Sequence, residues 1–141
     1  MSTKRVSEMT DDEIRDLAGV RDAPEYAVRD TAERAAEAVR LLNYLTLPGD
    51  GAPGLEFPSD IYDIVARLKT ATQRMPQLLG QMSGWLAAQE ESGRVAHDSG
   101  RDALGYVTEV RAALAEAAEF AGLLEEALNR AHNASSGLKA A

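Results

Sequence analysis

Apolar residues recur with heptad spacing over residues 60–91. With Ile61 at position a, the positions a, d and e are apolar except for Thr72. These positions are Ile61, Leu68, Met75 and Met82 at a, Ile64, Ala71, Leu78 and Trp85 at d, and Val65, Thr72, Leu79 and Leu86 at e. A stripe three positions wide is broader than the seam of a two-stranded coiled coil. The pattern predicts one long helix that packs against two neighbours at once.

Pro76 lies in the middle of this predicted helix, for which Ser59 is the expected N-cap. A proline inside a helix removes a backbone hydrogen bond and crowds the preceding turn, at a cost of about 3 kcal/mol or more. The heptad spacing nevertheless passes through Pro76 without a change of phase. Two helices that diverge would have no need to share a phase, so we expect one helix kinked at Pro76, or two nearly collinear pieces, and not a sharp corner.

Two further amphipathic stretches flank the long helix. Residues 23–46 form the first, with Asp22 as its expected N-cap and Pro24 in its first turn. Its inner positions are Val28, Thr31, Ala35, Ala38, Leu42 and Leu45. Residues 100–132 form the second, in which apolar residues alternate in steps of three and four. Its inner positions are Val107, Val110, Leu114, Ala117, Ala121, Leu124, Leu128 and Ala131.

A short helix is predicted over residues 11–18. Thr10 and Glu13 have the spacing of a capping box, in which each side chain accepts a hydrogen bond from the backbone N–H of the other residue. Gly19 is placed to end this helix, since glycine adopts the conformation that often follows a helix C-terminus. The helix has few apolar positions, so we expect it to need support from the rest of the fold.

Glycine, proline and serine mark the connections between the long helices, at residues 47–59 and 89–100. Short connections make neighbouring helices antiparallel. The predicted fold is therefore all-α, an up-down-up bundle of three long helices with a short N-terminal helix. We expect residues 10–132 to form this single domain, between a disordered segment at 1–9 and a flexible tail at 133–141.

Composition and charge limit the classes of function that the chain can have. The chain of 141 residues contains no cysteine, so it has neither a disulfide framework nor a thiolate metal site. No apolar run approaches the roughly 20 residues of a membrane span, and the first residues lack the apolar block of a signal peptide. We therefore expect a cytoplasmic location. The net charge of −8 disfavours nucleic acid and other anionic partners.

Patterns typical of catalysis or metal binding do not occur in the sequence. Neither His97 nor His132 belongs to a Glu-x-x-His motif, as metal sites inside helical bundles require. The chain has no Gly-x-Ser-x-Gly motif, and no Gly-Lys-Ser/Thr follows the glycine-rich loop. Carboxylates fall on predicted outer faces, where pKa shifts are small. We expect a protein without enzymatic activity, cofactor or metal.

Gly80 and Gly84 form a Gly-x-x-x-Gly spacing on the back of the long helix. A glycine in an exposed helix costs nearly 1 kcal/mol relative to alanine, and small residues four apart let another helix come close. Tolerance of glycine in a weak, kinked segment is the alternative interpretation. The leading hypothesis is a non-enzymatic interaction module that binds a second copy of itself or another helical protein. The candidate partner-binding residues are Pro76, Gly80, Gly84, Ala87, Val65, Leu79 and Leu86.

A first alternative function rests on a small basic cluster in the long helix. Arg67, Lys69 and Arg74 lie within two turns of one another and would suit a small accessory regulator that acts near nucleic acid. Phosphate neutralisation by such residues supplies most non-specific affinity for nucleic acid. A solvated helix face is the simpler interpretation of the same three charges.

Two short motifs resemble those of the helical-hairpin substrates of the type VII secretion system. Ser83, Gly84 and Trp85 are similar to the Trp-x-Gly turn of that family, in reversed order and inside a predicted helix. Tyr26 and Asp30 have the Tyr-x-x-x-Asp spacing of the family's export signal, which in that family follows the hairpin. The resemblance implies a second alternative, a secreted helical substrate.

Overall fold

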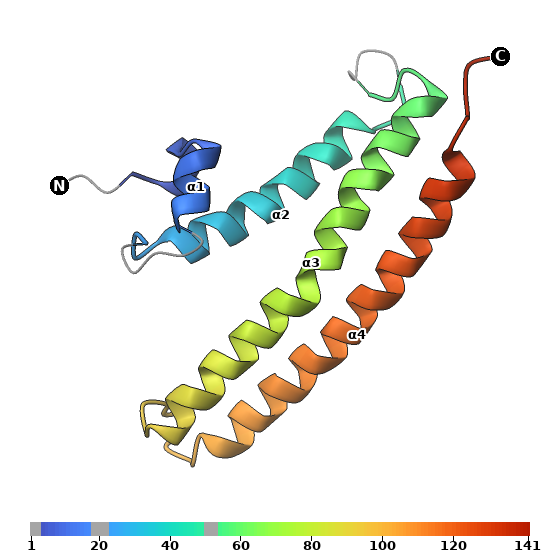
Figure 1. Ribbon diagram of the computed structural model, residues 1–141. Helices are drawn as coiled ribbons and strands as arrows, with labels where there is room; N and C mark the ends of the chain where they lie inside the picture. The colour runs from blue at the N-terminus through green and yellow to red at the C-terminus, as the bar shows by residue number, and fades with distance from the viewer. Residues whose placement is uncertain (1–3, 18–22, 50–53) are drawn as a thin grey trace. The chain divides into compact units, whose positions relative to one another are not determined.

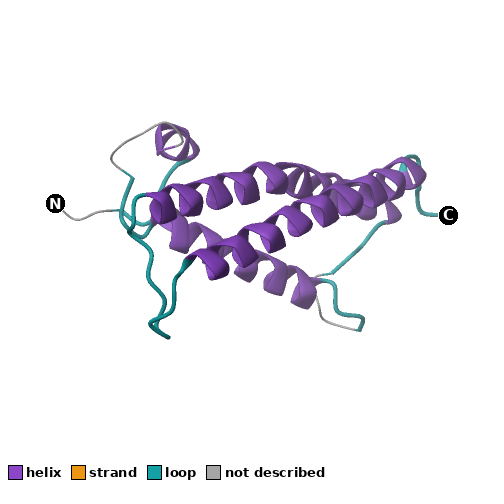
Figure 2. Cartoon of the chain, turned by 90° about the horizontal axis from the view of Figure 1, so that it is seen from below, coloured by secondary structure: helices purple, strands orange, loops and turns teal. Residues whose placement is uncertain are grey.

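The computed structural model describes residues 4–17, 23–49 and 54–141. This described part of the chain is helical and contains no strand (Figure 2), so the all-α prediction is confirmed. Its elements are the 3-10 helix η1 (Val6–Glu8) and the helices α1 (Asp11–Leu17), α2 (Ala27–Leu45), α3 (Pro58–Glu91) and α4 (Leu104–Ser135). The chain divides into two compact units, Met1–Leu55 and Glu56–Ala141, and each is described by itself.

The capping box at the start of α1 is confirmed. The backbone N–H of Thr10 donates to Glu13 Oε2 over 2.6 Å, and the backbone N–H of Glu13 donates to Thr10 Oγ1 over 3.3 Å. The hydrogen bond from Thr10 holds the pKa of the Glu13 carboxyl below its ordinary value, assisted by Lys4 at 3.0 Å. The predicted stop at Gly19 lies outside the described residues.

The 3-10 helix η1 connects the first residues of the chain to α2, in a stretch for which the sequence predicted no element. Val6 is 4% exposed, and its carbonyl oxygen accepts a hydrogen bond from Arg34 Nη1 over 3.2 Å. The predicted N-cap at Asp22 lies outside the described residues. Pro24 precedes α2 in a turn, where its carbonyl accepts the N–H of Ala27, so the helix begins later than predicted.

The long helix α3 begins at Pro58, and the prediction that Ser59 caps it is wrong. Pro58 occupies the first helical position, where a fixed φ and a missing N–H favour a helix start. Asp60 then reaches back, and its Oδ2 accepts the backbone N–H groups of Phe57 at 2.8 Å and Glu56 at 2.9 Å. These two hydrogen bonds hold the pKa of the Asp60 carboxyl below its ordinary value.

Helix α3 continues through Pro76 as one element and packs antiparallel against α4 (Figure 1). Two side-chain contacts define the register. The Tyr62 ring stacks on His132 with centroids 4.1 Å apart, and Arg111 Nε donates to Ser83 Oγ over 3.1 Å. Tyr62 and Ser83 are 21 residues apart, and so are Arg111 and His132. The register is therefore the same on both sides of Pro76.

The most buried positions of the seam between α3 and α4 carry small side chains. The most buried residues along it are Thr72 at 7% exposure and Ala121 at 6%, together with Val107 and Ser135. On α3 the half-buried or buried residues of the seam are Val65, Lys69, Thr72, Pro76, Leu79, Ser83 and Leu86. Among the described residues, no large side chain is fully buried. The hairpin has a close-packed seam but no core of large apolar residues.

On each helix, the face that meets the other helix is rotated by about one residue position from the face that the sequence predicted. On α3, position e and the adjacent row of Tyr62, Lys69 and Ser83 contact α4, whereas most of positions a and d are exposed. On α4, the predicted inner residues Val110 and Leu124 are exposed. The most buried positions of the seam hold small residues, which let two helix backbones approach, and several of the largest apolar residues lie beside it.

Candidate interaction surface

An exposed row of large apolar side chains runs along α3. Trp85 is 65% exposed and Leu78 is 51% exposed, although both occupy the heptad position expected to be most buried. The members of the row are Ile61, Met75, Leu78, Met82 and Trp85. Ile64 and Leu68 lie between Ile61 and Met75 and are half-buried. The exposed members of the row are therefore concentrated between Met75 and Trp85, with Ile61 separate near the beginning of α3.

Helix α4 carries a matching row. Its exposed apolar members are Val110, Phe120 and Leu124, with Leu123 at the outer edge. Ala113 and Ala117 fill the spaces between these larger residues along the helix. As on α3, the row adjoins the residues of the seam, here Leu114 and Ala121.

The two rows face the same side of the hairpin. At about 100° per residue, each row lies roughly a quarter turn from the seam, anticlockwise when its own helix is viewed from the N-terminus. Because α3 and α4 are antiparallel, equal turns in the same sense bring both rows to one side. We call this surface the apolar face: Ile61, Met75, Leu78, Met82 and Trp85 of α3 with Val110, Phe120 and Leu124 of α4.

Charged residues border the apolar face, with opposite sign on its two edges. On α3, Arg67 and Arg74 occupy the row next to Leu78, and both are exposed. On α4, Glu109 and Glu116 occupy the corresponding outer row and are also exposed. The face therefore has a basic edge and an acidic edge.

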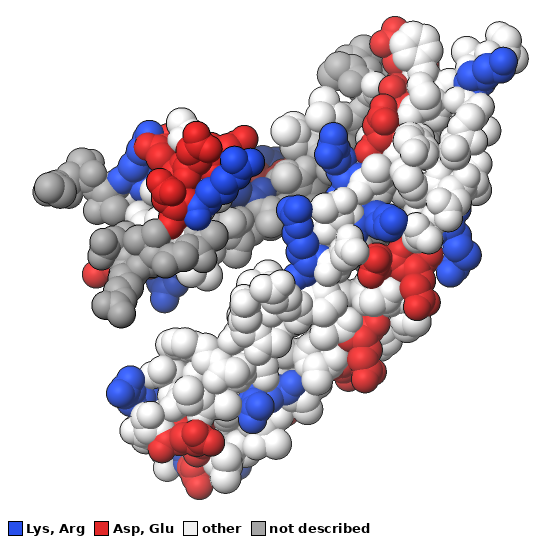
Figure 3. Space-filling model, in the orientation of Figure 1, with Lys and Arg blue, Asp and Glu red and all other residues white. Residues whose placement is uncertain are grey.

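The three basic residues proposed for nucleic acid are not brought onto one face. Arg67 and Arg74 share the outer row of α3, whereas Lys69 lies on the row of Ser83 and is half-buried at the seam. In the view of Figure 3, blue and red side chains are interspersed along the hairpin and do not form one basic area.

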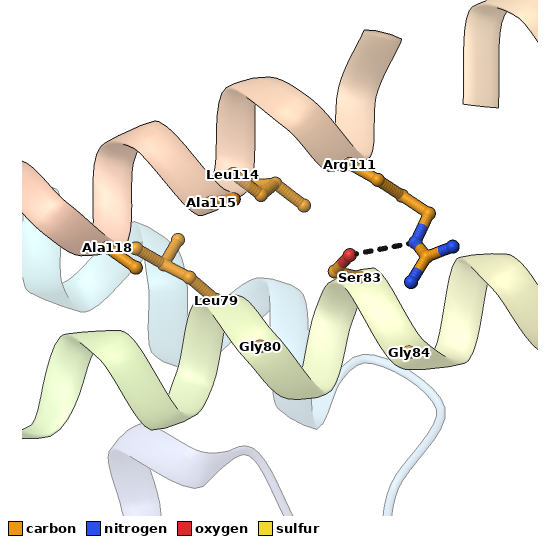
Figure 4. Close-up of a pocket in the computed structure, with 8 residues that line it drawn as sticks. All are labelled: Leu79, Gly80, Ser83, Gly84, Arg111, Leu114, Ala115 and Ala118. Carbon is orange, nitrogen blue, oxygen red and sulfur yellow. Dashed lines mark hydrogen bonds between the residues drawn. The ribbon is translucent and has the colours of Figure 1, made fainter. Parts of the chain in front are cut away.

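A shallow groove, whose lining residues are drawn in Figure 4, lies on the opposite side of the seam from the apolar face. Its lining residues are Leu79, Gly80, Ser83 and Gly84 of α3 and Arg111, Leu114, Ala115 and Ala118 of α4. We call it the glycine groove. A Cβ added at Gly80 or Gly84 would meet no atom within 4 Å, so α4 does not approach these glycines closely.

The structure divides the seven candidate partner-binding residues between two surfaces. Four lie on the rows that face α4, namely Val65, Pro76, Leu79 and Leu86, and are half-buried within the hairpin, and Leu79 also lines the glycine groove. The other three, Gly80, Gly84 and Ala87, lie on the side of the glycine groove. Their part in partner binding stays a prediction.

The sequence interpretation missed the apolar face because it placed these large residues inside the bundle. The signal that could have revealed the face is the distribution of small residues. On α3, Thr72 and Ser83 are 11 residues apart, and on α4, Ala118 and Ala121 are three residues apart. Each spacing places the two small residues on the same side of their helix. Such rows favour a close helix–helix seam, which leaves the larger residues of the neighbouring rows to contact a third element.

Other chemical groups in the described part of the chain are dispersed. There, no three His, Cys, Asp or Glu side chains are grouped so that they could hold a metal ion, and no helix has the length and apolarity to span a membrane. His97 stacks on Tyr106 with centroids 3.6 Å apart, and its Nδ1 accepts the backbone N–H of Ser99. No protein family, curated protein or solved structure matches the chain.

Proposed function

We propose that the protein is a non-enzymatic interaction module that binds helices through the apolar face of α3 and α4. The observation that carries this proposal is that both helices expose their large apolar rows on one side while their seam buries small residues. Full burial of a leucine, methionine or phenylalanine side chain contributes about 1.5–3 kcal/mol. Eight exposed apolar residues on one surface strongly favour a covering element, and large exposed apolar patches are typical of interaction sites.

The geometry of the apolar face favours a helical partner. Two parallel rows of side chains on adjacent helices form a groove, and an amphipathic helix fits such a groove with residues at i, i+3, i+4 and i+7. The partner would be a second copy of the chain or another helical protein. The charges along the two edges would orient it, since complementary charges at the rim select the direction of binding.

The predicted up-down-up bundle would use α2 as one such helix. With 19 residues, α2 is about 28 Å long, whereas the 34 residues of α3 span about 51 Å. Within that predicted arrangement, α2 would cover little more than half the length of the hairpin. A substantial part of the apolar face would still be available to a partner.

Site-specific photo-cross-linking in native cells tests the proposal. A photoreactive amino acid at Leu78, on the apolar face, is expected to give an intermolecular product. The matched control is the neighbouring residue Gln77, which points away from the face and is expected to give none. Equal yields at the two positions, or products confined to one chain, would contradict the proposed function.

Two alternative functions stay predictions with separate tests. A regulator acting near nucleic acid would be retained on DNA in a steeply salt-dependent way, and substitution of Arg67, Lys69 and Arg74 would reduce the salt dependence. The absence of retention at low salt would contradict it. A secreted helical substrate would be found in the culture medium of its host.

A further inference from the structure

We propose that a second copy of this chain covers the apolar face, with two hairpins packed face to face as a four-helix bundle. In this dimer α3 of one copy lies along α4 of the other, and all adjacent helices are antiparallel, as in up-down four-helix bundles. This inference rests on the proposed function and names its partner. It follows from the size of the face and from the charges along its edges.

The dimensions of the apolar face match those of a second hairpin. At 1.5 Å per residue, the face is about 36 Å long on α3, from Ile61 to Trp85, and about 21 Å long on α4, from Val110 to Leu124, and each helix is about 10 Å wide. Its area is therefore roughly 600 Å², the greater part of the ~800 Å² that each partner buries in a stable interface of standard size. A lone helix as short as α2 spans only part of that length, whereas a second apolar face has the same length and width.

The opposite charges at the two edges favour α3 beside α4 of the other copy. A two-fold axis parallel to the helices places the edge of Arg67 and Arg74 next to the second copy's edge of Glu109 and Glu116. An axis perpendicular to the helices would instead place α3 on α3, which brings like-charged edges together. Like charges across an interface oppose association, so the first arrangement is favoured.

The observed register identifies the best-matched pair of charges. From the contacts Tyr62–His132 and Ser83–Arg111, Arg74 lies level with Phe120 of α4. A two-fold axis parallel to the helices preserves these levels between the copies. Glu116 is one turn from Phe120, about 6 Å along the axis, which is within the reach of an arginine side chain. We therefore assign Arg74 of one copy to Glu116 of the second copy.

Molar mass by light scattering on the full chain tests the dimer directly. We expect twice the 15.1 kDa of the chain at micromolar concentration. Leu78→Glu is expected to give a monomer with unchanged helical content, whereas Gln77→Glu on the other side of α3 is expected to stay dimeric. A wild-type monomer, or a dimer that Leu78→Glu leaves intact, would overturn the proposal.

Charge exchange keeps the proposal testable if Leu78→Glu fails to fold. Arg74→Glu and Glu116→Arg are each expected to raise the dimer Kd on the order of tenfold at low salt, because two symmetry-related pairs become repulsive. The double variant is expected to restore the wild-type Kd. A double variant as weak as either single variant would overturn the assigned arrangement. A wild-type monomer whose Leu78 position still cross-links to another polypeptide would overturn only the dimer and support the proposed function.

Discussion

Arg111 of α4 donates a hydrogen bond to Ser83 of α3 in the same register in which Tyr62 stacks on His132, three heptads away. Pro76 lies between these two contacts on α3. A helix that changed direction sharply at Pro76 would not meet a straight partner at both levels. The proline is therefore accommodated within one helix whose packing on α4 continues across it.

Replacement of the proline should stabilise the hairpin. In Pro76→Ala, the new N–H can donate to the carbonyl of Thr72, one turn earlier, and the crowding of that turn is removed. We expect the free energy of unfolding to rise by about 1–3 kcal/mol, somewhat reduced by the lost contacts of the half-buried ring. Urea denaturation followed by circular dichroism measures this change. A decrease in stability would show that the ring contributes more to the seam than its backbone conflict costs.

The small residues of the seam should not tolerate enlargement. Ala121 is 6% exposed, so Ala121→Leu inserts three carbon atoms where the two helices meet. We expect a loss of about 1–3 kcal/mol, which is typical of overpacking in a filled interior. Ala131→Leu, at an exposed position of the same helix, is the matched control and should change stability little. Equal stability of the two variants in thermal unfolding would contradict the close seam.

The glycines of the glycine groove should accept a larger residue when no partner occupies the groove. No atom lies within 4 Å of a Cβ at Gly84, so Gly84→Ala is expected to stabilise α3 by about 0.5–1 kcal/mol through its higher helix propensity. Gly93 has a φ of +68°, so Gly93→Ala is the contrasting control and should destabilise by about 1 kcal/mol. Both changes can be measured by chemical denaturation.

A partner in the glycine groove would reverse the result at Gly84. If a helix packs there, as the Gly-x-x-x-Gly spacing suggested, Gly84→Ala would weaken association and Gly84→Leu would abolish it. Size-exclusion chromatography at several concentrations reports this directly. An unchanged elution volume for Gly84→Leu would contradict the hypothesis that Gly80 and Gly84 receive a partner.

The start of α3 should be sensitive to acid. The pKa of Asp60 is lowered in the folded state because its carboxylate accepts the N–H groups of Phe57 and Glu56. A lowered folded pKa stabilises the protein above the unfolded pKa of about 3.9, and this contribution is lost as the pH falls through the folded value. We expect Asp60→Asn to remove that part of the pH dependence. Thermal unfolding between pH 6 and about pH 2 compares the two proteins, and identical pH profiles would contradict this role of Asp60.

Local rules accounted for much of the fold. The pairing of Thr10 with Glu13 was predictable because a capping box depends only on residues three apart. The continuity of α3 through Pro76 was predictable because the apolar repeat keeps its phase. The first residue of α3 was not, since Ser59 is a good cap by residue type. Pro58 and the carboxylate of Asp60 together determine the start two residues earlier.

Which face of α3 meets α4 depends on the surfaces of both helices, so the pattern of one helix does not determine it. Positions a, d and e of α3 are all apolar, so the pattern alone allows several faces to meet α4. The outcome depends on both surfaces, because small residues such as Ala121 and Thr72 are buried where the helices meet, whereas Trp85 and Phe120 would hold the backbones apart. The large residues of the apolar face are consequently exposed. The apolar pattern of either helix alone does not show this.

The contact between Tyr62 and His132 has a practical consequence for protein engineering. It brings the first turn of α3 and the last turn of α4 to the same end of the hairpin, with their rings 4.1 Å apart. The segment from residue 56 to residue 135 can therefore be inserted as a rod into a surface loop of a host protein. Both junctions would lie near each other at its base, and the turn at Gly93 would project about 50 Å from the host.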